Sequence, residues 1–252
     1  MAVGSNKHPA TSTQQPKDIN THKMKKLSTL IVSALFIISS MYGQYYKAIT
    51  VEAGTPVAEK FPAGTRYLYP QFTDGTVNMR TGAVSNSRLN FNLLLGEMEF
   101  ISNADTLAIA RKKDLSIVTV AQDTFIYRNS YLKLIHSGTV KVLVKDWFKL
   151  TDIVKKGAMG APNRNSAIDS YTSIPTGKQL LALIPAEDLV FRRTLEFYIL
   201  KSDGDLIEFK KKNILDIYPE KENDIQKFLK ANKIDFEEQA DILKLADFLA
   251  IL

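Results

Sequence analysis

The chain has 252 residues, with 33 Lys or Arg and 27 Asp or Glu, and a formal net charge of +6. It contains no cysteine, which excludes disulfides, thiolate nucleophiles, cysteine-ligated metals and a lipid-modified cysteine anchor. Residues 1–43 hold five basic side chains and one acidic one, so residues 44–252 carry only +2, without the basic excess typical of nucleic-acid-binding proteins.

Residues 24–43 have the composition of a bacterial secretory signal peptide. A basic start, Met24-Lys25-Lys26, precedes an apolar run from Leu27 to Met41, and small residues lead to a predicted cleavage point at Gly43-Gln44. The run is shorter than the roughly 20 apolar residues of a membrane-spanning helix. We therefore expect export, with a retained N-terminal anchor as the alternative. Residues 1–23 are polar and aperiodic, and we expect a disordered leader or a misassigned translation start.

From about residue 65 to 150, apolar and polar residues alternate with the two-residue period of strands that have one buried and one solvated face. Residues 88–93 alternate without a break. In the following strand, two glutamates are predicted to point to solvent, opposite the apolar side chains: Glu97 and Glu99.

Three dipeptides predict hairpin turns: Asp74-Gly75, Ser137-Gly138 and Asp203-Gly204. The first two suit turns that need positive φ. Further strands are expected at residues 180–184 and 195–200, with 206–209 as the return strand of the last hairpin. Short sequential strands joined by tight turns form an antiparallel meander.

The stretch from Lys155 to Ser173 is rich in glycine, proline and amide residues and predicts a long loop. It lacks the spacing of a phosphate-binding Walker loop, although basic residues flank Gly157 and Gly160. Because loops on a rigid scaffold often carry binding residues, three basic residues are candidates for partner contact: Lys155, Lys156 and Arg164.

The C-terminal segment changes to a helical period. Ile225, Phe228 and Leu229 follow Pro219, and we expect Asn232 to end that helix in the left-handed conformation. The next helix is predicted to start with a capping box and to bury one apolar stripe. The box consists of Asp235 and Glu238, and the stripe of Ile242, Leu243, Ala246, Leu249 and Ala250.

The fold expected is therefore α+β. An antiparallel β-meander over residues 44–210, forming a curled sheet, a barrel or a sandwich, precedes a small helical unit over residues 211–252.

Catalytic patterns are weak. His136 is the only histidine after the leader, and it has neither a nucleophile motif nor a second histidine at metal spacing. Asp203-Gly204-Asp205 lacks the alternating oxygen ligands of a calcium loop. The basic runs 111–113 and 210–212 lack the interleaved aromatic residues of a nucleic-acid platform. No catalytic residue, metal or cofactor is predicted, and Trp147 with Phe148 is expected to lie in the core.

Four short features occur together in this chain: a signal peptide, an F-x-x-G-x-V segment (Phe72, Gly75, Val77), Asn90-Phe91-Asn92, and a glutamate-rich strand. With these features the chain resembles exported Bacteroidota proteins of unknown function, in which a β-rich domain precedes short C-terminal helices. The resemblance implies an envelope location and a fold, and it implies no activity.

Together these features favour a non-enzymatic periplasmic or outer-membrane-associated module that binds another envelope protein, with no transmembrane segment after the leader. Two alternatives stay open: a carrier of a lipid or apolar ligand within the curled sheet, and a carboxylate-based hydrolase of envelope glycan or peptide. The second would use Glu97 and Glu99.

Overall fold

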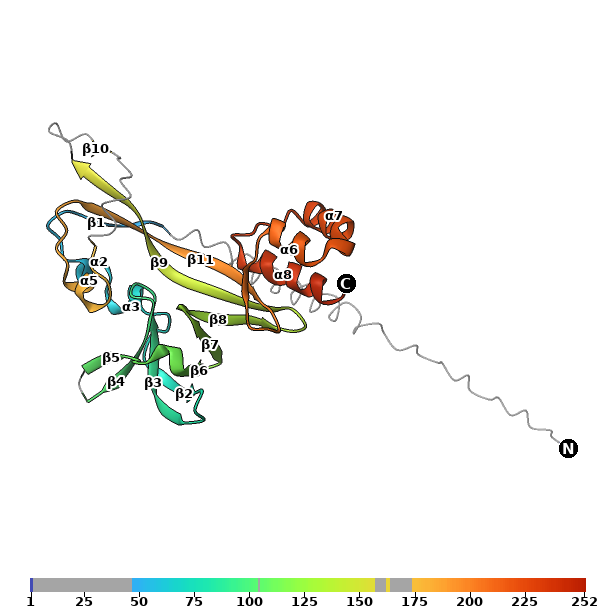
Figure 1. Cartoon of the computed structure of the whole chain (residues 1–252), viewed down its shortest axis with the longest axis horizontal. Coiled ribbons are helices and arrows are strands. Elements are labelled where there is room, and N and C mark those ends of the chain that lie inside the picture. Colours follow the sequence, from blue (N-terminus) through green and yellow to red (C-terminus); the bar gives the residue numbers. More distant parts are fainter. Residues whose placement is uncertain (2–46, 104, 157–161, 164–173) are drawn as a thin grey trace. The chain divides into compact units, whose positions relative to one another are not determined.

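The computed structural model describes Met1 and residues 47–103, 105–156, 162–163 and 174–252 (Figure 1). The chain divides into two compact units, Met1–Gln44 and Tyr45–Leu252, and nearly all described residues belong to the second. The predicted signal peptide and the residues before it lie outside the described residues.

The described part of the second unit is built on one antiparallel sheet of twelve strands. Along the sheet their order is β1-β11-β9-β8-β7-β6-β2-β3-β4-β5, with β10 paired to β9 and β12 to β11. The strands are β1 (Ile49–Val51), β2 (Thr73–Met79), β3 (Val84–Asn92), β4 (Glu97–Ser102), β5 (Asp105–Ala108), β6 (Leu115–Val120), β7 (Asp123–Arg128), β8 (Ser130–Ser137), β9 (Lys141–Lys156), β10 (Pro162–Asn163), β11 (Asp188–Leu200) and β12 (Leu206–Glu208). Neighbouring strands are mostly consecutive in the chain, which confirms the α+β fold with an antiparallel meander.

The sheet is open but strongly curled. The turn between β3 and β4 returns to the middle of β9, where the Phe148 backbone N–H donates to the Leu93 carbonyl at 2.9 Å. Aromatic rings fill the inside of the curl, with edge-to-face pairs of Phe61 with Phe148 and Phe191 at centroid distances of 5.0 and 5.2 Å. Of the three forms left open by the sequence, the structure is the curled sheet.

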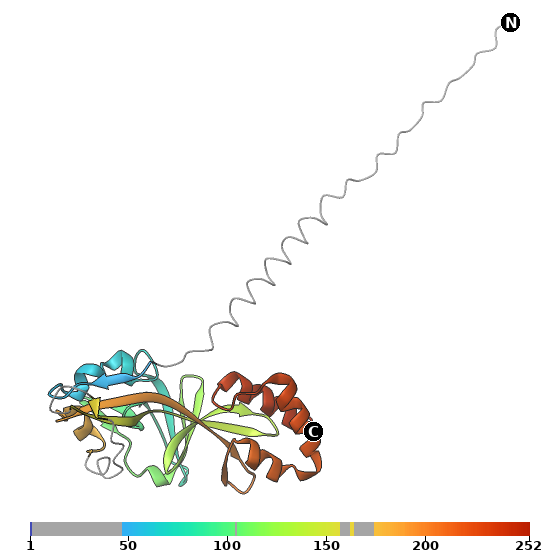
Figure 2. The same ribbon diagram turned by 90° about the horizontal axis from the view of Figure 1, so that it is seen from above.

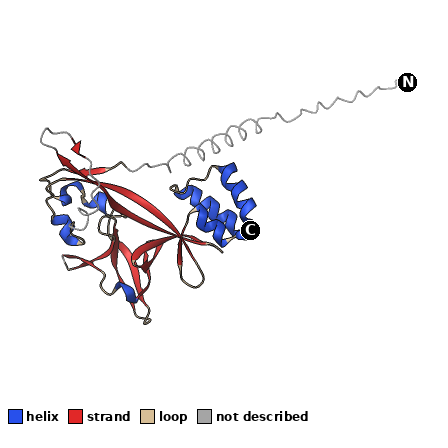
Figure 3. Ribbon diagram, turned by 45° about the horizontal axis from the view of Figure 1, so that its top comes forward, coloured by secondary structure: helices blue, strands red, loops and turns tan. Residues whose placement is uncertain are grey.

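Helices lie in two places (Figure 2 and Figure 3). Short helices near β1 are α2 (Val57–Lys60), α3 (Ala63–Arg66) and α5 (Lys178–Ala182), and a 3-10 turn, η2 (Lys112–Asp114), precedes β6. The C-terminal group consists of α6 (Lys211–Ile217), η3 (Pro219–Lys221), α7 (Glu222–Asn232) and α8 (Gln239–Ala250). None of the helices among the described residues is long and apolar enough to cross a membrane.

The long ribbon of β9 and β11 supports two separate hydrophobic clusters. Phe148 and Phe191 belong to the cluster inside the curl, together with α2 and α5 residues. Val142, Val144 and Phe197 belong to the other cluster, which the C-terminal helices cover. The ribbon is therefore shared by the core of the curled sheet and by the core under the C-terminal helices.

Helix α8 packs through residues at helical spacing. Ile242, Leu245, Ala246 and Leu249 are 0–3% exposed. The predicted stripe was correct for three of these, but Leu245 takes the place of Leu243, which is only half-buried. Leaving apolar positions of a helix outside the buried stripe makes them available for other contacts.

The first predicted turn is wrong. Asp74 and Gly75 lie inside β2, where Gly75 is paired with strands on both sides. A Cβ at Gly75 would lie 2.4 Å from the Thr119 carbonyl oxygen and 2.7 Å from Leu89 Cδ1, so the glycine serves close strand approach. The chain instead reverses at Gly82, whose φ is +89°.

The other two predicted turns are confirmed as connections between strands. Gly204 has φ +91°, as an Asp-Gly hairpin turn requires. Gly138 connects β8 and β9 without positive φ, so the conformation expected there is wrong. A Cβ at Gly138 would lie 2.8 Å from the His136 ring, and this close approach explains the glycine.

The strand predicted at residues 180–184 is wrong, because residues 178–182 form α5. A short apolar run does not distinguish a buried strand from a buried helix. Its Leu180 is 8% exposed and joins the cluster inside the curl. Leu183, directly after α5, links this helix to α2, because its carbonyl accepts a hydrogen bond from the Val57 N–H at 3.0 Å.

The helix ends differ from the predictions by small shifts. Lys233, not Asn232, adopts the left-handed conformation after α7, with φ +50°. Asp235 does not cap α8, which begins after Glu238. The Asp235 carboxylate instead accepts from the Glu237 backbone N–H at 2.9 Å, while Asp241 accepts from the Asp235 N–H.

Candidate functional site

Of the three basic residues predicted to lie in a contact loop, the structure describes two, and both lie on a strand. Lys155 and Lys156 belong to the end of β9 and pair with Asn163 and Pro162 of β10, so the predicted loop start is wrong. Lys155 Nζ lies 3.5 Å from Glu187 Oε1. Arg164 lies outside the described residues. The alternation of β9 continues further than the glycine-rich composition suggested.

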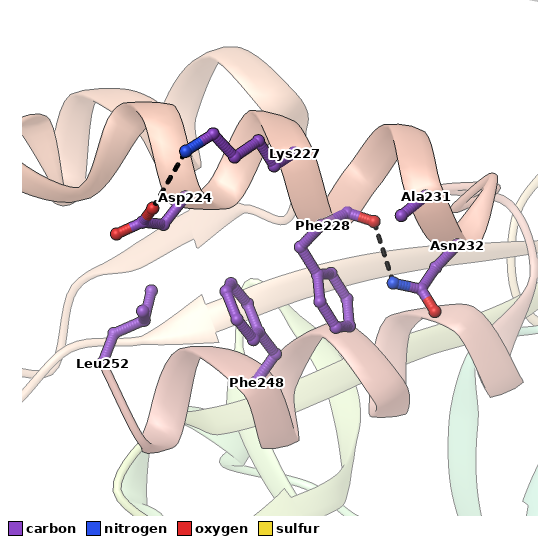
Figure 4. A pocket seen from close by; sticks show the side chains of 7 residues that line it. All are labelled: Asp224, Lys227, Phe228, Ala231, Asn232, Phe248 and Leu252. Atoms are coloured by element: carbon purple, nitrogen blue, oxygen red, sulfur yellow. Dashed lines mark hydrogen bonds and ion pairs between the residues drawn. The ribbon is translucent and has the colours of Figure 1, made fainter.

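A surface groove lies between α7 and α8, with a volume of about 420 Å³ (Figure 4). Phe228 and Phe248 form its floor, with stacked rings whose centroids are 4.0 Å apart and whose planes differ by 10°. Both rings are half-buried. The groove is lined by Asp224, Lys227, Phe228, Ala231, Asn232, Phe248 and Leu252.

The rim of the groove is polar and its charges are paired. Lys227 Nζ lies 3.8 Å from Asp224 Oδ1, and both side chains are mostly exposed. Asn232 donates from Nδ2 to the Phe228 carbonyl at 2.9 Å, which stabilises the last turn of α7 beside the ring. An exposed ion pair contributes little stability. The groove therefore has an apolar floor and one pair of oppositely charged side chains at its rim.

The sequence prediction missed this groove. Phe228 was assigned to the apolar face of its helix, and Phe248 does not belong to the predicted stripe of α8. Phe248 lies one residue before the buried Leu249, and its half-buried ring stacks on Phe228. A large aromatic residue outside a helix's buried stripe is the signal that could have indicated a contact surface.

The two glutamates of β4 are not on a solvated face, contrary to the prediction. Glu99 is 2% exposed. Its Oε2 accepts from the Tyr67 hydroxyl at 2.6 Å and from Asn92 Nδ2 at 3.4 Å. Burial, followed by the hydrogen bond and the charge of Glu99, raises the pKa of Tyr67 to about 12. Tyr67 is thus a neutral donor to Glu99 over the whole physiological range.

Glu97 points to the same side and forms an ion pair between Oε1 and Lys112 Nζ. Its other oxygen, Oε2, is buried without a partner. The alternating pattern failed here because residues 66–69 cover this face of β3. The Asn90 amide, for example, exchanges two hydrogen bonds with the backbone of Tyr69, at 3.1 and 2.9 Å.

His136 has a structural position, as its place beside a turn predicted. A carbonyl oxygen only accepts, so Nδ1 donates to the Val140 carbonyl at 2.5 Å, while Nε2 lies 3.0 Å from Asp247 Oδ1 of α8. These contacts join the β8–β9 hairpin to the helical group.

Phe148 lies in the core as predicted, at 7% exposed. Trp147 is only half-buried, and Lys145 Nζ lies 3.6 Å from its ring centroid. Among the described residues, no three His, Asp or Glu side chains come together in a way that could hold a metal ion.

Searches against protein-family models, curated proteins and solved structures find no match to this chain. The inferences about its function therefore rest on its own residues.

Proposed function

We propose that the protein is an exported, non-enzymatic module that binds another protein of the cell envelope. Export is supported by the order of basic, apolar and small residues in 24–43. The contact surface proposed is the groove between α7 and α8, and the partner contributes a short apolar segment whose side chain packs on the ring of Phe248.

The single observation that carries this proposal is the stacked pair of Phe228 and Phe248 on an open surface. Aromatic residues are enriched in protein interfaces, and those in the middle of an apolar patch with a polar rim contribute most of the binding free energy. The paired charges of Asp224 and Lys227 leave no excess charge to attract a charged ligand. This arrangement fits an apolar peptide segment.

The two alternatives gain less support from the structure. The inside of the curl, where a carrier would hold its ligand, is filled by side chains such as Phe61, Phe91 and Phe125, which are 0–3% exposed. A carboxylate-based hydrolase needs an acid that reaches its substrate, yet Glu99 is buried and accepts from two protein donors.

A photo-crosslinking amino acid at Ala231 tests the proposal in living cells, because Ala231 is exposed and lines the groove. The matched control is the same amino acid at Lys244, an exposed position of α8 that does not line the groove. We expect one envelope protein to be crosslinked from position 231 and not from position 244. Equal, unselective products from both positions would contradict the proposal.

A further inference from the structure

Two exposed aliphatic side chains lie in one row beside the β2–β3 hairpin. Val84, the first residue of β3, is 62% exposed, and Ile117 of β6 is 39% exposed. Both are directly opposite Asn78 of β2, one on each side of it. Residues directly opposite each other in a sheet point to the same face, so the two aliphatic side chains share one face. Single exposed apolar residues are ordinary on protein surfaces, but a contiguous row is typical of a contact surface.

Basic residues surround the tip of the same hairpin, which we define as residues 80–84. Arg80 donates from Nε to the Lys113 carbonyl at 3.2 Å, and from its backbone N–H to the Asp114 carbonyl at 2.8 Å. Both acceptors belong to η2, which follows Arg111. Figure 1 and Figure 3 show the hairpin tip and η2 together at the lower end of the second unit, away from the C-terminal helices.

The tip and η2 carry an excess of positive charge. Lys112 is paired with a glutamate of β4. Within the described residues, no ion pair joins Arg80, Arg111 or Lys113 to an acidic side chain, and all three are exposed. Asp114 is the only acidic residue in the two segments, which leaves an excess of two positive charges beside the aliphatic row.

This combination fits an anionic lipid surface. Next to the aliphatic row, the same sheet face has short uncharged side chains, Thr76, Asn86 and Thr119, so contact with lipid headgroups buries no charge there. Aliphatic side chains enter the boundary between headgroups and acyl chains, while nearby basic side chains meet the lipid phosphates. A single-stranded nucleic acid would stack on exposed aromatic residues, and the hairpin tip and η2 contain none.

We propose that the tip of the β2–β3 hairpin, together with η2, docks the protein on a membrane surface that contains anionic lipids. Val84 and Ile117 insert at the interface, and Arg80, Arg111 and Lys113 bind the lipid phosphates. Two short side chains and three cations give weak, reversible binding and not a permanent anchor. The tip and the groove between α7 and α8 lie at different ends of the second unit, so this contact is separate from the proposed protein-binding surface (Figure 1).

Vesicle co-sedimentation of the compact unit Tyr45–Leu252 tests the proposal. This unit contains both hydrophobic clusters and excludes the apolar run of residues 27–41, which would itself bind membranes. Vesicles of phosphatidylethanolamine with an equal amount of phosphatidylglycerol supply the anionic surface, and vesicles of phosphatidylcholine alone are the neutral control. We expect the unit to sediment with the anionic vesicles, to be released by high salt, and to stay in solution with the neutral vesicles.

A pair of double variants tests the basic residues. Arg111→Gln with Lys113→Gln removes two charges beside the tip. The matched control, Lys149→Gln with Arg192→Gln, removes two exposed charges from directly opposite positions of the β9–β11 ribbon. A basic residue near an anionic membrane contributes roughly fivefold to affinity, so we expect about 25-fold weaker binding of the first variant and little change in the control. Equal losses in both would show that net charge alone drives binding and would overturn the proposal.

A second pair of variants tests insertion of the aliphatic row. Val84→Ser and Ile184→Ser replace side chains that are 62% and 60% exposed. We expect roughly fivefold weaker vesicle binding for Val84→Ser alone, with circular dichroism showing that both variants are folded. Self-association of the unit without vesicles, abolished by Val84→Ser, would assign the row to a second copy of the chain. That result, or no binding of the wild-type unit to anionic vesicles, would overturn the proposal.

Discussion

Asp146 and Arg193 form a two-pronged ion pair at the point where the two hydrophobic clusters meet on the β9–β11 ribbon. Arg193 Nε lies 2.7 Å from Asp146 Oδ1, and Nη2 lies 2.6 Å from Oδ2. Val144 of β9 lies on one side of the pair, in the helix-covered cluster, and Phe148 lies on the other, in the curl. The pair thus separates two cores that share one face of the ribbon.

Removing one partner of this ion pair leaves the other charge buried. We expect Asp146→Asn to lower the free energy of unfolding by about 2–4 kcal/mol. This is toward the low end of the loss for buried ion pairs, because the side chains of Asp146 and Arg193 are still 10% and 19% exposed. Urea denaturation measures the change. The control, Asp203→Asn, disrupts an exposed pair with Lys201 and should change stability by no more than about 0.5 kcal/mol. Equal effects of both substitutions would contradict the role assigned to Asp146.

Gly75 and Gly64 form a matched pair for testing the packing of β2. Because a Cβ at Gly75 meets the Thr119 carbonyl at 2.4 Å, Gly75→Ala should destabilise the protein by about 2–3 kcal/mol or more. Gly64 lies in α3 with nothing within 4 Å of an added Cβ, so Gly64→Ala should be neutral or stabilise by up to about 1 kcal/mol. Thermal unfolding of both variants checks this. A stable Gly75→Ala variant would show that β2 does not lie where the structure has it.

The raised pKa of Tyr67 predicts a loss of stability in alkali. The folded state keeps the Tyr67 proton up to a pKa of about 12, while the unfolded chain loses it near the ordinary tyrosine pKa of 10.0. Above about pH 10 the folded state binds more protons than the unfolded state, so stability falls as the pH rises. This part of the fall should be absent in Tyr67→Phe, while the same variant should be less stable near neutral pH because Glu99 loses a donor.

Unfolding free energies of wild type and Tyr67→Phe at about pH 8 and about pH 11 give the measurement. Tyr198, whose pKa is also raised to about 12 by burial and Glu196, contributes equally to both proteins and cancels in the difference. Identical pH dependence in wild type and variant would show that the folded state does not raise the pKa of Tyr67.

Export predicts a defined processing event. If residues 24–43 are a signal peptide, the protein recovered from native cells should begin at Gln44, the residue after the predicted cleavage point. Intact-mass measurement of the envelope and cytoplasmic fractions tests this. A protein that keeps the run from Leu27 to Met41 and fractionates with membranes would favour the retained anchor instead.

Local patterns predicted much of the fold because strands and helices have their own periods. The alternation around Leu89 and Phe91 placed β3 correctly, and the helical spacing of Ile242, Ala246 and Leu249 placed α8. What failed depends on distant contacts. Gly75 looks like a turn residue until its two neighbouring strands are known.

The sites were harder to predict for the same reason. Glu99 is buried by Tyr67, which lies 32 residues away, and nothing in the alternation of β4 indicates that contact. The groove joins Phe228 and Phe248 from two helices, and a helical pattern shows only which residues face the sheet. The basic residues chosen instead, Lys155 and Lys156, were selected by composition, and they lie on a strand.

Affinity purification from gently solubilised native envelopes tests the proposed binding function most directly. Wild type is compared with Phe248→Ala in the groove and with Ile184→Ala, which removes a side chain that is 60% exposed outside the groove. Circular dichroism shows that each variant is folded. Truncating a central aromatic contact typically costs about 2 kcal/mol, roughly thirtyfold in affinity. We expect an envelope protein to co-purify with wild type and Ile184→Ala and to be lost with Phe248→Ala; the same partners at the same yield with folded Phe248→Ala would contradict the proposal.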